Sequence, residues 1–244
     1  MWGNAPLLRS IASALFFCSV VGMLYGAVHY VVHQPKLLPI KSVALASLPQ
    51  RVVASEVLAV VQREVHGNFF TVNIEQVRRS LEKLPWVRNV SIRREFPGRL
   101  VVQFEEHQPL AHWNDVALVN QQGEVFVAET TEALPRFDGI EGSSVEVMQQ
   151  YAKFGQQLAG LNLKVTQLVL SPRHAWQLHL SNDMVVELGR EAMGQRLARF
   201  VTVYPYSLAA LPPPTAKCAV QEQVKFIDMR YRNGFAVRMR NSNA

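Results

Sequence analysis

The most prominent pattern in the chain is an uninterrupted apolar run near its beginning. No Asp, Glu, Lys or Arg occurs between Arg9 and Lys36, and residues 11–32 form the apolar centre of this gap. A helix of that length, at about 1.5 Å rise per residue, extends roughly 33 Å and can cross the hydrocarbon core of a bilayer. The alternative is a cleaved signal peptide, whose apolar region is usually only about 7–15 residues long. We therefore expect a retained transmembrane helix over residues 11–32, preceded by a short tail of residues 1–10.

Two stretches after the apolar run have hydrophobic residues at helical spacing. In the first, Leu58, Val61 and Val65 share one face, and the side chain of Ser55 can cap the helix. In the second, Asn73 precedes a stripe of apolar residues and can accept a hydrogen bond from the first turn. The sequence therefore predicts two consecutive amphipathic helices.

The pattern then changes from helical spacing to strict alternation. Residues 86–94 and residues 100–105 each place polar and apolar side chains in turn, which is typical of strands with one buried face. The intervening Phe96-Pro97-Gly98-Arg99 segment predicts a turn between antiparallel strands. Together with a short strand over residues 40–45, these elements predict the order β-α-α-β-β for residues 38–108.

Residues 109–244 predict a second domain in which strands and helices are mixed. The pattern predicts a hairpin at 118–126, strands at 166–170, 176–180 and 184–188, and helices at 143–158 and 191–204. Ser143 and Glu146 suit a capping box for the first of these helices. Residues 208–223 lose periodicity and include three consecutive prolines, which indicates a loop.

The last elements of the chain predict a hairpin with one free edge. Asn233-Gly234 is a strong turn signal between strands over residues 224–231 and 235–240. No further strand is predicted to cover the far side of the last strand, so its backbone groups are available to an incoming strand. We expect the N–H of Ala236 to be one of these free donors.

Composition and charge narrow the functional classes. The chain has 25 Lys and Arg residues against 19 Asp and Glu, but the basic residues are spread along it and form no nucleic-acid-binding motif. Cys18 lies in the apolar run and Cys218 lies far beyond it, so no disulfide framework is expected. We expect a basic surface near anionic lipid headgroups and no nucleic-acid partner.

No residue pattern indicates catalysis or metal binding. Of the seven histidines, His107 and His112 lie nearest to a cluster with Glu105 and Glu106, but strand spacing directs these side chains to opposite faces. We therefore interpret the two histidines as ordinary surface residues. G-x-S-x-G, P-loop and G-x-G-x-x-G motifs are missing from the sequence. We expect no enzymatic activity, no metal, no cofactor and no small-molecule substrate.

Several longer motifs resemble the FtsQ/DivIB family. The run Leu84-Pro85-Trp86-Val87-Arg88-Asn89-Val90, continued by Arg94-Glu95-Phe96-Pro97-Gly98-Arg99-Leu100, is similar to the POTRA domain of that family. The similarity extends to Leu188-Gly189-Arg190, to Ile227-Asp228-Met229-Arg230-Tyr231 and to Asn233-Gly234-Phe235-Ala236-Val237. The resemblance implies an α+β protein with a single N-terminal transmembrane helix, a POTRA domain over residues 38–108 and a C-terminal mixed β-sheet domain with flanking helices over residues 109–244.

The same resemblance implies a partner set and a location. The β domain is expected to bind FtsB and FtsL and to link early septal-ring proteins such as FtsK to the peptidoglycan synthesis proteins FtsW and FtsI, with FtsN as a further possible partner. The N-terminus would be cytoplasmic and the ectodomain periplasmic, in the cell inner membrane at the division septum. The protein would act as an essential division scaffold.

Two candidate binding surfaces follow from the hairpin and from the basic strand. The candidate partner-binding residues of the β domain are Arg190, Arg230, Tyr231, Asn233, Gly234, Phe235, Ala236 and Val237. The candidate recruitment surface of the POTRA domain consists of Arg88, Arg93 and Arg94. The alternatives are that Tyr231 and Phe235 belong to the core, and that the three arginines only form a solvated strand.

Two other functions are compatible with parts of the sequence. A periplasmic membrane-anchored hydrolase would need a nucleophile with a base within reach, and the sequence predicts none. A POTRA-containing protein of outer-membrane protein transport would need a long C-terminal barrel, for which residues 109–244 leave no room.

Overall fold

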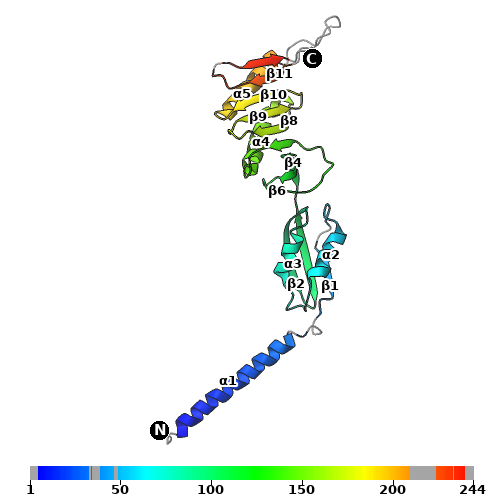
Figure 1. Ribbon diagram of the computed structural model, residues 1–244, viewed down its shortest axis with the longest axis vertical. Helices are drawn as coiled ribbons and strands as arrows, with labels where there is room; N and C mark the ends of the chain where they lie inside the picture. Colours follow the sequence, from blue (N-terminus) through cyan, green and yellow to red (C-terminus); the bar gives the residue numbers. More distant parts are fainter. Residues whose placement is uncertain are drawn as a thin grey trace. The chain divides into compact units, whose positions relative to one another are not determined.

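The computed structural model describes residues 5–32, 34, 39–46, 49–208, 224–232 and 234–239. The chain divides into two compact units, with the division between His107 and Gln108. Figure 1 shows the elements of each unit in chain order. Cys218, Asn233 and most of the predicted loop over residues 208–223 lie outside the described residues.

The first element is the apolar helix that the sequence predicts. Helix α1 extends over Ala5–Val32, and its segment Arg9–Val32 is long and apolar enough to cross a membrane. Its apolar side chains are exposed to the surroundings rather than buried in a core. An exposed apolar surface of this size requires an apolar environment to cover it.

The rest of the first unit has the predicted order β-α-α-β-β. It comprises β1 (Ser42–Leu45), α2 (Ala54–Glu64), α3 (Ile74–Leu81), β2 (Val87–Glu95) and β3 (Arg99–Glu106). In the sheet β3 lies in the centre, parallel to β1 and antiparallel to β2. The buried residues of both helices and of the strands form one hydrophobic core.

Helix α2 buries only part of the predicted stripe. The predicted residue Val61 is buried and Val65 packs against the core, whereas Leu58 is half exposed and Val57 and Val60 are buried in addition. The predicted cap at Ser55 is also wrong, because the N-cap position is Val53 and no side chain caps it. The stripes containing Val57 and Leu58 both have helical spacing, so the contact with the sheet decides which one is buried.

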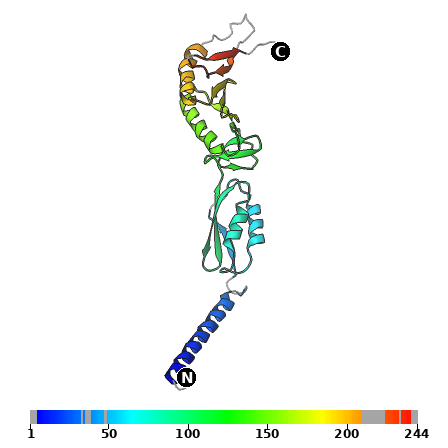
Figure 2. The ribbon, with the colours of Figure 1, turned by 60° about the vertical axis from the view of Figure 1, so that its left-hand side comes forward.

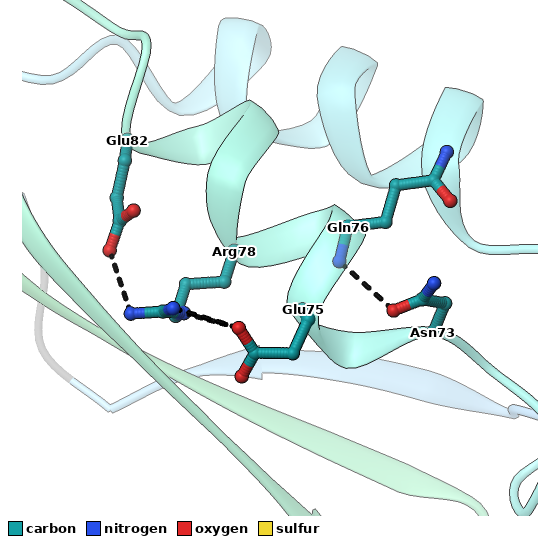
Figure 3. A network of polar contacts seen from close by, with 5 residues as sticks. All are labelled: Asn73, Glu75, Gln76, Arg78 and Glu82. Atoms are coloured by element: carbon teal, nitrogen blue, oxygen red, sulfur yellow. Dashed lines mark hydrogen bonds and ion pairs between the residues drawn. The ribbon is translucent and has the colours of Figure 1, made fainter.

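The start of helix α3 confirms the predicted cap. Asn73 accepts a hydrogen bond from the backbone N–H of Gln76 at 3.1 Å (Figure 3). On the exposed side of the same helix, Arg78 forms ion pairs with Glu75 at 2.7 Å and Glu82 at 3.4 Å (Figure 3). These pairs raise the pKa of Arg78 and stabilise consecutive turns of the helix.

The second unit contains one mixed sheet of nine strands with helices. Its elements are β4 (Pro109–Trp113), β5 (Ala117–Asn120), β6 (Val125–Phe126), β7 (Arg136–Asp138), α4 (Ser144–Leu158), the 3-10 turn Ala159–Leu161, β8 (Val165–Leu170), β9 (Trp176–Leu180), β10 (Val185–Gly189), α5 (Met193–Val203), the π-turn Tyr204–Leu208, β11 (Val224–Asp228) and β12 (Ala236–Met239). The strand order is β12-β11-β10-β9-β8-β7-β4-β5-β6. Strands β10 and β11 are parallel, and β11 and β12 are antiparallel.

Helices α4 and α5 cover one face of this sheet (Figure 2). The residues buried between helices and sheet are Phe154 and Leu158 of α4, Leu197 and Phe200 of α5, and Leu168, Leu178, Val186 and Ile227 of the strands. Residues in between, such as Gln177, His179 and Glu187, point to the opposite face and are only partly buried. The sheet therefore has one apolar and one mixed polar face.

Three details of the second unit differ from the sequence-based expectation. Strands β4 and β7 were not predicted. Strand β7 is only three residues long and pairs with β4 and β8, which are distant in the chain, whereas β4 pairs both with β7 and with the adjacent strand β5. Ser143 occupies the N-cap position of α4, but its hydroxyl donates to the carbonyl of Ile140 at 2.6 Å instead of capping the helix. Ser144 donates to the carbonyl of Gly123 and so ties the helix start to the β5–β6 turn.

Candidate functional site

The candidate site of the second unit is the outer edge of the nine-stranded sheet. Strand β12 is the last strand of the sheet and pairs with β11 alone among the described strands. All four of its residues, Ala236 to Met239, are exposed. An edge strand of this kind presents backbone N–H and C=O groups that can pair with another chain.

The direction of the free backbone groups follows from the pairing of β11 with β10. The N–H of Met229 donates to the carbonyl of Glu187 on the β10 side, at 3.0 Å. Because backbone groups alternate in direction along a strand, Asp228 directs its N–H and C=O to the other side, toward β12. Asp228 lies opposite Ala236 in the register, so Ala236 directs its own backbone groups inward. Its neighbour Val237 therefore presents N–H and C=O at the open edge.

This geometry corrects the expectation that Ala236 is a free edge donor. The backbone N–H and C=O groups of Ala236 and Arg238 point toward β11, where Asp228 and Phe226 lie opposite them. The backbone groups of Val237 and Met239 alternate with these and point outward, away from β11. The strand and its exposure agree with the sequence-based prediction, but the N–H groups available to a partner are those of Val237 and Met239 and not that of Ala236.

A shallow hollow of about 460 Å³ lies beside the open edge. It is lined by Tyr231, Arg232, Gly234, Phe235 and Ala236. The side chain of Tyr231 is exposed, with 58% of its surface accessible, whereas Phe235 is partly buried and packs against the core. The hollow thus combines Phe235, which packs against the core, with the exposed aromatic side chain of Tyr231, which a partner can contact.

The turn before β12 is attached to helix α5. Arg199 of α5 donates from Nη1 to the backbone carbonyls of Tyr231 at 3.1 Å and Arg232 at 2.8 Å. These bonds satisfy two carbonyls that leave the strand, and they hold the segment of Tyr231 against the helix. Asn233 lies outside the described residues, so the predicted Asn233-Gly234 turn has no structural description.

An ion pair between Asp228, the last residue of β11, and Arg230 orders the same segment. Arg230 donates to the carboxylate of Asp228 from Nε at 2.9 Å and from Nη2 at 2.6 Å, and its backbone N–H donates to the same carboxylate at 3.0 Å. These hydrogen bonds lower the pKa of Asp228 although the residue is buried, and they raise the pKa of Arg230. Arg230 is therefore a positioned residue, with its outer surface still accessible.

The neighbouring strand β10 contributes a further carboxylate and a glycine with a left-handed backbone conformation. Glu187 lies opposite Asp228 in the parallel register, and burial raises its pKa, with Arg230 opposing the rise and Asp228 adding to it. Gly189 has a φ of +70°, and a Cβ there would come within 2.8 Å of the Arg196 guanidinium. The predicted Leu-Gly-Arg motif therefore needs glycine for both conformation and space.

Arg190 follows this glycine and points away from the fold. Its side chain is largely exposed and pairs with Glu191 at 3.7 Å. The structure brings Arg230, Tyr231, Gly234, Phe235, Ala236 and Val237 together on one stretch of the sheet edge. Within the described residues, the ion pair of Arg190 is with Glu191 and not with a member of that group, although Gly189 adjoins the Arg230 side chain.

The three arginines of the first unit do not share one face. Strand β2 has a register shift between Val87 and Asn89, so Arg88 occupies an irregular position, where it forms an ion pair with Glu105. Arg93 is exposed and has only a long contact with Glu95, at 3.7 Å. The next residue, Arg94, points the other way and donates to the carbonyl of Val72 at 2.9 Å. The basic strand thus contains one freely presented arginine and two with fixed contacts.

Several residues that shape the candidate sites were not predicted from the sequence. Asp228, Glu187 and Arg199 were not predicted to take part. Asp228 and Arg230 carry opposite charges two residues apart in the sequence, which is a detectable signal. Arg199 gives no such signal, because its carbonyl partners lie more than thirty residues away. His107 was interpreted as a surface histidine but is buried. Among the described residues, no group of three or more His, Cys, Asp or Glu side chains could hold a metal ion.

Comparison with known proteins adds independent findings. Residues 38–107 match the family description "POTRA domain, FtsQ-type", and residues 111–230 match "Cell division protein FtsQ/DivIB, C-terminal". Strand β12 and Tyr231 lie beyond the second match, so any role of theirs has to be argued from geometry.

Relatives named "Cell division protein FtsQ" are similar to nearly the whole chain. The relative from Nitrosospira multiformis is 41% identical, covering 98% of this chain and 99% of its own length. Those from Burkholderia pseudomallei and Bordetella pertussis are 36% and 34% identical, covering 98% and 97% of this chain and 94% and 92% of their own lengths. Together with the apolar helix and the two folded units, these matches show that the chain belongs to the FtsQ/DivIB family of cell-division proteins.

Proposed function

We propose that this chain is a non-enzymatic division scaffold that binds FtsB and FtsL through the open edge of β12. Membership of the family supports a role in the division machinery. The observation that carries the finer proposal is the exposed outer edge of β12, whose free N–H and C=O groups belong to Val237 and Met239. A strand of a partner added there would gain main-chain hydrogen bonds, with its alternate side chains providing selectivity.

The surroundings of the edge suit an acidic partner with an apolar anchor. Arg190, Arg230 and Arg238 are exposed around the hairpin, and the hollow beside β12 offers Tyr231 and partly buried Phe235. Arginine and tyrosine are frequent energetic anchors at protein interfaces. Basic side chains on an edge also discourage two copies of the chain from pairing with each other.

The scaffold role further requires a defined topology and location. In this proposal α1 is retained in the cell inner membrane, the N-terminus is cytoplasmic, and both folded units are periplasmic at the division septum. The units would connect FtsK, as an early septal-ring protein, with FtsW and FtsI, which synthesise septal peptidoglycan, and FtsN would be a further partner. Support comes from the membrane-length helix and from the family.

The first unit supplies a second part of the proposal. We assign to Arg88, Arg93 and Arg94 a recruitment surface for early division proteins, centred on Arg93. Arg93 is the one of the three whose charge is presented to solvent with only a weak partner at 3.7 Å. Arg88 and Arg94 contribute mainly by holding β3 and the residue 70–72 segment in place.

The edge proposal is tested by two proline variants of adjacent residues. In Val237→Pro the lost N–H points outward, so the hairpin keeps its hydrogen bonds while the edge loses a donor. We expect its affinity for FtsB to fall about tenfold or more, with cooperative unfolding preserved. In Ala236→Pro the lost N–H faces Asp228, so we expect the hairpin itself to be destabilised.

Val237→Ala is the matched control, because it removes the side chain and keeps the N–H. Binding is measured by titration of detergent-solubilised protein with FtsB, and folding by thermal unfolding of the same samples. If folded Val237→Pro protein binds FtsB as tightly as the unchanged chain does, the docking edge lies elsewhere on the second unit. Equal losses in Val237→Pro and Val237→Ala would assign the effect to the side chain instead of the backbone.

A further inference from the structure

The first unit carries two large aromatic side chains that its core does not use. Phe70 is 51% exposed and Phe96 is 74% exposed. They come from different segments, the loop between α2 and α3 and the turn between β2 and β3, yet both adjoin the buried ring of Phe69. The centroid of Phe69 lies 5.4 Å from that of Phe70 and 6.3 Å from that of Phe96. We call these three residues the aromatic tip.

The aromatic tip is held in place by an organised loop. The buried side chain of Asn68 accepts hydrogen bonds from the backbone N–H groups of Phe70 and Thr71, both at 2.9 Å. On the other side of the loop, Arg94 donates to the carbonyl of Val72 at 2.9 Å. Because the backbone is fixed from two sides, the exposure of Phe70 is a feature of the fold rather than of a frayed segment.

The aromatic tip lies where the chain leaves the apolar helix. Asn68, next to Phe69, donates from Nδ2 to the carbonyls of Val32 at 2.6 Å and Gln34 at 3.1 Å. Val32 is the last residue of α1. On the other flank, the N–H of Lys41 donates to the carbonyl of Gly98 in the β2–β3 turn at 2.7 Å. The loop segment of the aromatic tip is therefore attached to the end of the span at Val32 and Gln34, and the turn segment is attached to Lys41, nine residues beyond the end of α1.

Basic residues surround the aromatic tip. Lys41 and Arg99 are exposed beside the β2–β3 turn, and Arg94 lies beside Phe70. Glu95 is the acidic residue of the turn, and it has contacts with Arg93 at 3.7 Å and Arg99 at 4.0 Å. Positive charge is therefore in excess on this surface, which favours an anionic ligand.

We propose that the aromatic tip inserts into the headgroup boundary of the anionic bilayer that α1 spans. Aromatic rings flanked by Lys and Arg are typical of protein surfaces that lie in a membrane interface, with the rings among the first acyl carbons and the charges at the lipid phosphates. The attachment at Val32 favours lipid over a protein partner, because it keeps the surface at the end of the span. The proposal concerns the first unit and does not depend on FtsB docking at β12.

The test places probes on the full chain in vesicles of phosphatidylethanolamine and phosphatidylglycerol. In a background of Cys18→Ser and Cys218→Ser, single cysteines at Phe96→Cys or Leu58→Cys carry a nitroxide label. Leu58 is the matched control, because it is half exposed and belongs to the same unit but lies on α2. Collision rates with oxygen and with a water-soluble nickel chelate report whether each label lies in lipid or in water.

We expect the label at position 96 to favour oxygen several-fold over nickel, and the label at position 58 to favour nickel. Adding Phe70→Ser should move the label at position 96 toward water, since it removes the exposed ring that remains when Phe96 is replaced by the labelled cysteine. Replacing phosphatidylglycerol by phosphatidylcholine should make position 96 shallower.

Equal water exposure at positions 96 and 58 would overturn the proposal. The same result is expected if a protein, rather than lipid, covers the aromatic tip in the cell, because the vesicles contain no such protein. An unchanged depth in neutral vesicles would overturn the role of the anionic headgroups. Thermal unfolding of each labelled chain confirms that the compared samples are folded.

Discussion

The carboxylate of Asp228 is expected to stabilise the sheet edge on which the proposed partner docks. The side chain accepts a backbone hydrogen bond and a two-point ion pair, all from Arg230. A neutral hydrogen bond contributes about 0.5–1.5 kcal/mol and one to a charged group about 1.5–3 kcal/mol, with the lower values appropriate for the half-exposed arginine. Asp228→Ala should therefore lower the free energy of unfolding by about 2–3 kcal/mol.

Asp228→Asn is the informative comparison, because the amide oxygen can still accept the backbone N–H while the charge is lost. Removing the charge also relieves its repulsion of Glu187, which faces Asp228 across β10 and β11. We expect a loss of about 1 kcal/mol for this variant. For a unit of this size each kcal/mol lowers the melting temperature by about 4 °C, so the alanine variant should melt about 8–12 °C lower.

The effect of Asp228 must also depend on pH in a defined direction. Hydrogen bonds from Arg230 lower the pKa of Asp228 in the folded state. A lowered folded pKa means that the stabilisation is fully present above the unfolded pKa of about 3.9 and is lost as the pH falls through the folded value. The difference in stability between the unchanged chain and Asp228→Asn should therefore be constant near neutral pH and shrink in acid.

Urea unfolding of the purified full chain, followed by the fluorescence of buried Trp176 in the same core, measures these differences. A difference between the unchanged chain and Asp228→Asn that stays constant down to pH 2, or Asp228→Ala protein as stable as the unchanged chain, would refute the reasoning. Because Asp228 also orders Arg230 next to the hollow, Asp228→Ala should weaken FtsB binding even in the folded fraction.

Two further predictions concern the first unit. Arg93→Glu should reduce septal localisation in cells while the melting temperature changes little. Arg94→Glu, in contrast, should lower the melting temperature because the carbonyl of Val72 loses its hydrogen-bond donor. If the Arg93→Glu protein still localises to the septum, the strand has no recruitment role. Asn73→Ala should cost about 1 kcal/mol through loss of the cap of α3, seen as faster amide exchange in its first turn, while Glu75→Gln should have a smaller effect (Figure 3). Exchange that is equally fast in both variants would contradict the cap.

Features that depend on residues near one another in the chain were predictable from the sequence. The uncharged run is apolar for the length of a bilayer, so helix α1 required no tertiary information. The order of elements in the first unit followed from the change of period from about 3.6 to 2, and the cap at Asn73 from its spacing to the helix. The terminal hairpin was predicted in the same way from its turn residues.

Only the tertiary structure decided between alternatives that fit the local sequence pattern equally well. In α2 the stripes containing Val57 and Leu58 both have helical spacing, and packing against the sheet selected the first. In β2 the register with β3 introduced an irregularity at Arg88, which a strict alternation could not anticipate. The order of nine strands likewise depends on parallel pairings between segments far apart in the chain.

The candidate docking edge shows most clearly which features the sequence determines and which ones only the tertiary structure determines. The sequence alone determined that a hairpin ends the chain and that its last strand follows Tyr231, because the turn residues and the alternation are local properties. It could not determine whether Ala236 or Val237 presents its N–H, since that depends on which side of β11 faces β10. The hydrogen bond from Met229 to Glu187 settles this through the parallel pairing of β10 and β11, which are separated in the chain by residues 190–223, including helix α5. Backbone direction is set by long-range register, and only the folded sheet provides it.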